Sequence, residues 1–547
     1  YRFDRATDGG RIVPEYFSTT VWDGAVDVSW YDKTKSEFYL DTPAKLAGLA
    51  ALVNGRVDIG TPAYRIKGDQ KELVSTREDN YLIIGAGGGD LRGTVYLGDA
   101  AHDFSDKVVY LTTDLDMGGE KNWTPIGGKY AMDAINGEFL IEAFFNGTLD
   151  GQGHRITNLR CDRYTAKGYA YSWAIGLVGY MGELYDGETA PATAPAVRNL
   201  SVDGSVYGRR SVGGIVGKSG SVSTGVFIEN CANFASVKNT DAKGVGGIIG
   251  MAAGTGAIVN CYNTGNVTTT YACPAGGVIG SNGGMDVYNC YSVGTIDSGG
   301  NRRGRGIGGH DKGSYTVSDC YYLLGSDDDP DSNGWYRGTA LSITISVTAM
   351  SQTEMRSQKL VDALNVNGAA YAAASGAYPI LAWEATPSFE QLSVTLMQPD
   401  GGTIAANCGA TVPFGTVLHL SNIPATGWAF RGYSLNGKTL TGPYATVTEN
   451  AEVSGSFAQL VAGTLYIQND PDFTIQVVKD GTVMVDGIAQ RVTKHPVADG
   501  DPLYEGDVLT ATATLAANAE PDDLNEVYTG KLCYYFSFLD ESGKQTK

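Results

Sequence analysis

The acidic side chains between residues 114 and 162 are the first candidates for chemistry in this chain of 547 residues. Two carboxylates about 5–9.5 Å apart can share the acid and the nucleophile or base roles of glycoside hydrolysis. Asp150 and Asp162 are the pair that such an enzyme would use here, with Asp114 and Asp116 nearby. Asp150, however, stands in the stretch Gly-Thr-Leu-Asp-Gly, and an aspartate in such a stretch also stabilises a turn. A structural role is therefore the alternative.

A second group of acids could bind a hard cation. The segment Asp-Asp-Asp-Pro-Asp-Ser-Asn-Gly at 327–334 places carboxylates at alternate positions, namely Asp327, Asp329 and Asp331. Alternate acids followed by a glycine are typical of part of a calcium loop, although a glutamate at the proper distance is missing. Calcium is the one cofactor that the sequence indicates, and a solvated acidic loop is the alternative.

Aromatic side chains suited to ligand binding precede an insertion at 183–196. Tyr169, Tyr171 and Trp173 alternate along the chain there. Aromatic faces stack on sugars or pack into protein partners while their polar ends stay in water. These three residues are the candidate binding site. The alternative for Trp173 is that it packs beneath the inserted loop.

Composition and missing motifs exclude several classes of function. The formal net charge is −20, so nucleic acid is not an expected partner. The repeats show no column of Lys or Arg such as a lyase would need, and the one basic cluster is Arg302-Arg303 with Arg305 on a predicted turn. HExxH and GxSxG are both absent, which argues against a peptidase. No apolar run approaches the roughly 20 residues of a membrane helix, so we expect no membrane insertion.

A repeat of about 30 residues must position these side chains. The dipeptide Asn199-Leu200 returns at steps of 31, 30, 29 and 30 residues, as Asn230-Cys231, Asn260-Cys261, Asn289-Cys290 and Asp319-Cys320. Short apolar strands separated by Gly and Asn turns predict an all-β fold, a parallel β-helix with about 30 residues per coil. In that register the Leu/Cys column is internal. Helices at 42–53, with Thr42 as N-cap, and at 352–364 are expected to cap its ends.

Three segments resemble known bacterial surface modules. Gly-Gly-Ile-Val-Gly at 213–217 and Asn-Cys-Tyr-Asn-Thr-Gly-Asn-Val at 260–267 resemble the GLUG repeat of surface proteins and IgA-peptidase-like adhesins. Residues 391–458 resemble a divergent internalin-type B repeat, a small β-grasp-like module. The expected domains are a capped β-helix at 1–388, the B-repeat-like module at 389–460 and a β-sandwich-like module at 461–547.

The resemblance implies an extracellular protein, secreted or attached to the cell wall. Because the chain begins at Tyr1, we expect a fragment of a longer secreted precursor. The expected function is adhesion or ligand display by a monomer, with a host or dietary glycan or a host protein as partner. The alternative is a carbohydrate-active β-helix enzyme, a glycoside hydrolase or polysaccharide lyase, that uses paired acids. A cleft with two close carboxylates would favour the enzyme.

Overall fold

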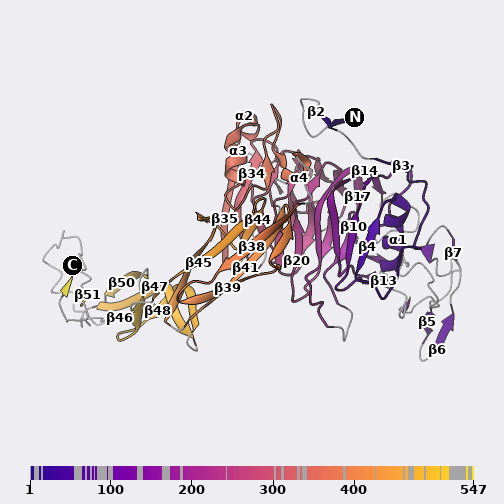
Figure 1. The fold of residues 1–547 in the computed structure, drawn as a ribbon. Coiled ribbons are helices and arrows are strands. Elements are labelled where there is room, and N and C mark those ends of the chain that lie inside the picture. Colours follow the sequence, from indigo (N-terminus) through magenta and orange to yellow (C-terminus); the bar gives the residue numbers. More distant parts are fainter. Residues whose placement is uncertain are drawn as a thin grey trace. The chain divides into compact units, whose positions relative to one another are not determined.

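The computed structural model shows a protein built almost entirely of strands (Figure 1). Within the described residues the helices are short, and α1 (Pro43–Val53) is the longest of them. The structure describes residues 17–54, 103–131, 139–162, 173–184, 189–241, 243–300, 303–308, 313–328, 333–335, 342–385, 390–425, 427–459, 462–465, 473–485, 488–504 and 507–515, together with short strands within 2–13, 64–96 and 538–546.

Equivalent residues of successive repeats pair in parallel, as their spacing predicts. The strands β17 (Ala196–Gly208), β22 (Ser236–Asn239), β27 (Val267–Thr269) and β32 (Ile296–Asp297) follow one another across four repeats. Their paired positions form one row, made of Val206, Val237, Val267 and Ile296. Each member of this row is 0–1% exposed, so the row is part of the core.

The predicted parallel β-helix is nevertheless wrong as a fold class. The largest sheet closes on itself into a barrel of parallel strands, and several separate sheets accompany it. The long strands β14 (Thr148–Asp162) and β17 bend through a corner without ending, and β17 pairs with three short strands of the next repeat. The strand stacks on the two sides of this corner are thereby joined into one closed sheet, while the glycine-bounded blocks of the repeats form separate sheets.

Corner residues with left-handed backbone make this bend compatible with continuous pairing. The φ angles at the recurring Asn or Asp lie between 50° and 56° at Asn158, Asn199, Asn230, Asn260, Asn289 and Asp319. Asn and Asp tolerate this conformation better than other residues that carry a Cβ atom. The residue type at the predicted corner is therefore set by backbone geometry.

The predicted internal column is confirmed. It consists of side chains that are 0% exposed, namely Leu200, Cys231, Cys261, Cys290 and Cys320. Leu159, which was expected in the same column, is also buried but pairs with Gly204, so it belongs to a different row. All these cysteines are free thiols. Burial raises the pKa of the Cys261 and Cys320 thiols well above the ordinary value, so they remain neutral and act as apolar packing groups.

The first predicted helix is confirmed and packs into this core. Helix α1 begins after Thr42, whose side chain accepts a hydrogen bond from the Lys45 amide, and Pro43 occupies its first turn. Leu46 and Leu49 are fully buried in the same hydrophobic cluster as the repeat core. The helix therefore covers apolar surface of the first repeats.

The second helical segment differs from the prediction. It divides into α2 (Gln352–Met355) and α3 (Gln358–Leu364), because Ser357 starts a new helix and donates its hydroxyl to the Glu354 carbonyl. Both helices share a cluster with the outward-facing row of Ala232, Tyr262 and Tyr291. This segment covers a side face of the repeats, so the expectation that it caps an end is corrected.

Contacts divide the chain into two compact units. The first comprises residues 1–392 together with 413–417 and 446–449, and the second comprises the remaining residues. In the second unit, β47 (Phe473–Val485) pairs antiparallel with β48 (Ile488–Val497) and β50 (Val508–Leu515). The predicted division into domains at 388 and 460 stays a prediction.

Candidate functional site

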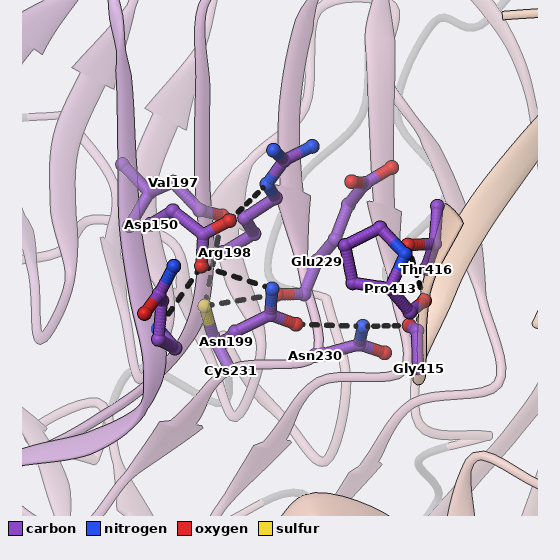
Figure 2. A network of polar contacts seen from close by, with 11 residues as sticks. Asp150, Val197, Arg198, Asn199, Glu229, Asn230, Cys231, Pro413, Gly415 and Thr416 are labelled. Carbon is purple, nitrogen blue, oxygen red and sulfur yellow. Dashed lines mark hydrogen bonds and ion pairs between the residues drawn. The ribbon is translucent and has the colours of Figure 1, made fainter. Parts of the chain in front are cut away.

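Asp150, the first candidate acid, is engaged in structural contacts. Its Oδ2 lies 2.9 Å from Arg198 Nε, and its Oδ1 accepts hydrogen bonds from Asn199 Nδ2 at 3.1 Å and from the Gln152 amide at 3.0 Å (Figure 2). Burial lowers the pKa of Arg198, but attraction by Asp150 and Glu229 outweighs it, so this pKa stays above the ordinary value. The guanidinium is therefore a permanent partner of Asp150.

A ladder of side-chain amides begins at the same carboxylate. Asn230 Nδ2 donates to Asn199 Oδ1 at 3.0 Å, Asn260 donates to Asn230 at 2.9 Å, and Asn289 donates to Asn260 at 3.3 Å. Figure 2 shows the first of these bonds and a second bond from Asn230 to the Gly415 carbonyl. Every amide donates toward the preceding repeat. Asp150 accepts from Asn199 and thus terminates the ladder.

Asp162 is not brought together with Asp150. The two stand at opposite ends of β14, and residues with positive φ at Gln152 and Asn158 turn the chain between them. The backbone of Asp162 exchanges two hydrogen bonds of 2.7 Å with the Asn122 side chain. The two acids are thus separated along the length of β14, and their use as a catalytic pair stays a prediction.

The neighbouring acids are also held by local partners. Asp114 Oδ1 lies 3.1 Å from His154 Nδ1 and accepts a hydrogen bond from the Arg155 amide at 3.0 Å. Asp116 Oδ1 accepts from Asn158 Nδ2 at 2.7 Å. These contacts join one repeat to the next. The carboxylates near the entrance of the repeats are therefore explained by structure.

The predicted calcium loop is described only in part. Asp327 Oδ2 accepts a hydrogen bond from the Gly306 amide at 3.1 Å, while Asp329 and Asp331 lie outside the described residues. In the part of the chain that the structure describes, no three His, Cys, Asp or Glu side chains are grouped to hold a metal ion. The calcium site therefore stays a prediction. The Asp327 carboxylate holds the backbone of the preceding repeat by this hydrogen bond.

Of the predicted aromatic site, Trp173 is described, whereas Tyr169 and Tyr171 lie outside the described residues. Trp173 begins β15 (Trp173–Ile175), which pairs with β18 (Arg210–Gly213). The Arg210 guanidinium lies 4.7 Å from the centre of the Trp173 ring. Arg209 Nη2 and Arg210 Nε each lie 3.1 Å from Asp241 Oδ2. Trp173 thus belongs to a half-buried cluster of aromatic and charged side chains.

This cluster continues along the turns of the following repeats. The strand positions Val212, Val245, Ala275 and Gly304 are paired in sequence across repeats. Cations stand one or two residues before three of them, at the same end of the paired strands: Arg210 begins β18, and Lys243 and Arg303 stand in the turns before the next strands. We name this edge the turn ridge, defined by Trp173, Arg209, Arg210, Lys243, Tyr271 and Arg303.

Several side chains of the turn ridge are accessible to a ligand in solution. Lys243 and Arg303 are exposed, and the Tyr271 side chain is 49% exposed. Arg303 Nη1 donates to the Ala272 carbonyl at 3.1 Å, so its guanidinium lies against the turn that carries Tyr271. Beside the ridge, exposed Lys238 lies 5.2 Å from the centre of the Tyr207 ring.

A buried polar column holds the turns of the ridge in place. Its members are Asn239, Thr269 and Ser298, each 0–1% exposed. Asn239 Oδ1 accepts from the Asp241 amide at 3.3 Å, Thr269 Oγ1 accepts from the Tyr271 amide at 3.1 Å, and Ser298 Oγ accepts from the Arg303 amide at 2.9 Å. Each turn is thus fastened by the side chain that precedes it.

Charged side chains of the neighbouring turns surround the Cys273 thiol. Burial raises the pKa of the Cys273 thiol to about 11; Arg303 lowers it and Asp241 raises it. The turn ridge itself carries four cationic side chains, with Asp241 as the acid that bridges two of them. In a chain of net charge −20, these cations gather on one edge, where Asp241, Asp297 and Asp328 stand among them.

Reasoning from sequence missed the turn ridge. It found no basic column and singled out Arg302, Arg303 and Arg305 as a cluster on a turn. Arg305 instead ends the strand β33 (Gly304–Arg305), is 8% exposed and donates from Nη1 to the Gly304 carbonyl. Arg302 lies outside the described residues. The available signal was the placement of Arg210 and Lys243 before successive glycine-bounded apolar blocks.

Comparisons with known proteins give limited matches. No family model matches the chain. A stretch of 124 residues is 32% identical to Halomucin of Haloquadratum walsbyi, which amounts to 20% of this chain and 1% of that protein. A crystal structure of a candidate immunoglobulin A1 protease from Bacteroides ovatus covers 51% of this chain and 86% of its own, with 23% identity and a TM-score of 0.36. A TM-score this low carries no argument. Among the described residues, no helix is both long enough and apolar enough to cross a membrane.

Proposed function

We propose that this protein is a secreted or cell-surface protein that binds an extracellular glycan or a host protein through the turn ridge. The observation that carries the proposal is the alignment of Trp173, Tyr271 and the ridge cations on one edge of successive repeats. The partial match to a protein named Halomucin supports an extracellular location. Rigid repeats with exposed aromatic and cationic turns suit recognition of a ligand surface.

Binding is favoured over catalysis because the candidate acids serve the fold. Asp150 is paired with Arg198 and terminates the amide ladder, and Asp114 accepts hydrogen bonds from the next strand. A general acid must be able to give up its proton to a substrate, whereas Asp150 is 7% exposed and fixed by three partners.

An array of glycans and host proteins tests the proposal. The intact chain should bind at least one ligand, and Trp173→Ala should reduce that binding at least tenfold, because removal of an aromatic anchor typically costs 2 kcal/mol or more, about a 30-fold change in affinity. Tyr39→Ala is the matched control, since Tyr39 is 53% exposed and lies in β4 (Glu37–Leu40), away from the ridge. Equal binding by both variants would refute the role of the turn ridge.

A further inference from the structure

We propose that the ligand of the turn ridge is a linear polysaccharide that carries carboxylates, bound with its chain along the stacking direction of the repeats. This inference rests on the proposed function and specifies its ligand class. It is carried by the order of charged and aromatic side chains along the ridge, by the carboxylate that the ridge already binds, and by the acids that flank it.

The order of side chains favours a polymer over a small ligand. Arg210, Lys243, Tyr271 and Arg303 belong to four successive repeats. Paired strands lie about 4.8 Å apart, so these four positions extend over roughly 14 Å. Along the stacking direction, the four repeats present a cation, a second cation, an aromatic ring and a third cation, one to each successive group of a ligand. A sugar chain with regularly spaced acidic groups offers a matching series, whereas a single sugar would reach only two repeats.

The chemistry of the ridge favours carboxylates. Asp241 places one carboxylate oxygen 3.1 Å from both Arg209 and Arg210, so the chain itself already pairs these guanidiniums with the kind of group proposed for the ligand. Arginine forms geometrically specific hydrogen bonds with carboxylates. Exposed Tyr271 adds a flat apolar face on which a sugar ring can stack, and the Trp173 ring lies against the Arg210 guanidinium and supports it. Cation and ring together match an acidic sugar.

The flanking acids favour a polysaccharide over a nucleic acid. Asp241 lies among the ridge cations, and exposed Asp297 ends a strand beside them. One strand of a nucleic acid carries a phosphate about every 3.4 Å and needs clustered Lys and Arg to neutralise it. The ridge supplies about one cation per 4.8 Å repeat and interrupts them with carboxylates. A ligand of lower charge density is better matched to it.

The test compares acidic polysaccharides with their neutral forms. Polygalacturonate, alginate and hyaluronate are each measured against their methyl-esterified forms by calorimetry with the intact chain. We expect at least one acidic form to bind tenfold more tightly than its ester at low salt, and this preference to fall as salt is added. Affinity should also rise with oligosaccharide length up to the span of four repeats.

Substitutions of ridge cations test whether the turn ridge causes the preference for the acidic polysaccharide. Lys243→Gln and Arg303→Gln should each weaken binding of the acidic form about two- to fivefold, as expected for exposed charge pairs, and leave the ester unaffected. Lys35→Gln, which removes an equally exposed cation elsewhere, should change neither. In the double variant, the fold-reductions in affinity caused by the two substitutions should multiply, because the two side chains stand two repeats apart.

The outcomes separate this inference from the proposed function. Equal affinity for acidic and esterified forms, or tighter binding of single-stranded poly(dT) than of the acidic polymers, would overturn the inference. If a neutral glycan or protein binds in a Trp173-dependent way while the acidic polymers do not, the proposed function stands and the inference fails. If Trp173→Ala is without effect on every ligand, both fail.

Discussion

Asp319 interrupts the amide ladder, and its replacement by Asn should stabilise the protein locally. Each ladder amide donates to the Oδ1 atom of the preceding repeat. Asn289 Oδ1 therefore needs a donor from position 319, but an ionised aspartate has none. In the described structure, Asn289 Oδ1 is buried and has no hydrogen-bond partner. The substitution Asp319→Asn supplies the missing donor.

The magnitude follows from the missing hydrogen bond, because the backbone suits either residue and the Ser318 hydrogen bond weakens when its acceptor loses its charge. A buried acceptor without a partner costs about 1–3 kcal/mol, and a new hydrogen bond recovers about 1 kcal/mol of it. The φ angle of 55° at Asp319 suits asparagine. Ser318 Oγ, which donates to the Asp319 carboxylate at 2.9 Å, can donate to the amide oxygen instead. The expected gain of about 1 kcal/mol corresponds to roughly a fivefold change in an equilibrium constant.

Local hydrogen exchange is the suitable assay, because a chain with several units does not unfold in one step. Amide protection around residues 287–321 should rise about fivefold in Asp319→Asn. Asn260→Asp is the opposing control, since it removes the donor to Asn230 Oδ1 and should lower protection in its own repeat. Unchanged or reduced protection in Asp319→Asn, or unaffected protection in the control, would refute a directional ladder.

Three further outcomes are expected. Cys261→Asp should cost several kcal/mol in denaturation experiments, because it buries a charge in the thiol column, whereas Cys261→Ala should cost less. Calcium titration should show heat and a raised Tm if the loop at Asp327, Asp329 and Asp331 binds the ion, and neither at millimolar calcium if it does not. The Glu354 pKa is lowered to about 2 by hydrogen bonds with Lys359 and Ser351. Its contribution to stability is present above the ordinary pKa near 4.5 and is lost as pH falls toward 2, so the Tm difference from Glu354→Gln should shrink over that range.

The internal positions of the repeats could be predicted because burial and backbone geometry act on single residues. A period near 30 with Leu or Cys at the returning position predicts stacking, and the column at Cys261 is confirmed as buried. The N-cap at Thr42 is equally local and is confirmed by its hydrogen bond to the Lys45 amide. In both cases the residue type reports directly on its immediate surroundings.

The closure of the sheet could not be predicted in the same way. It depends on whether hydrogen bonding continues through the corner, as it does in β17, and the Asn at that corner is compatible with a continuous or a broken strand. The spacing of the repeats predicts which residues stack, but it does not predict whether strand hydrogen bonding continues through the corner. The predicted β-helix was therefore wrong although its register was right.

The candidate site was missed for a related reason. Turns differ in length, so Arg210 and Lys243 are 33 residues apart and Arg303 follows 60 residues later, which hides them from a fixed period. Strand pairing aligns them, because it fixes Val212, Val245 and the following strands irrespective of turn length. Side chains that a sequence pattern scatters can thus meet on one edge.

Strand interiors and turns are under different physical demands in this fold. An internal position such as Val237 must pack against its equivalents in both neighbouring repeats, so its residue type can vary little. The turns are not packed on both sides in this way, and Asn239, Thr269 and Ser298 fasten them by hydrogen bonds from the buried side. Charge and aromatic character can therefore change from one turn to the next without loss of the frame. The turn ridge is the edge on which the described chain places cations and aromatic rings together.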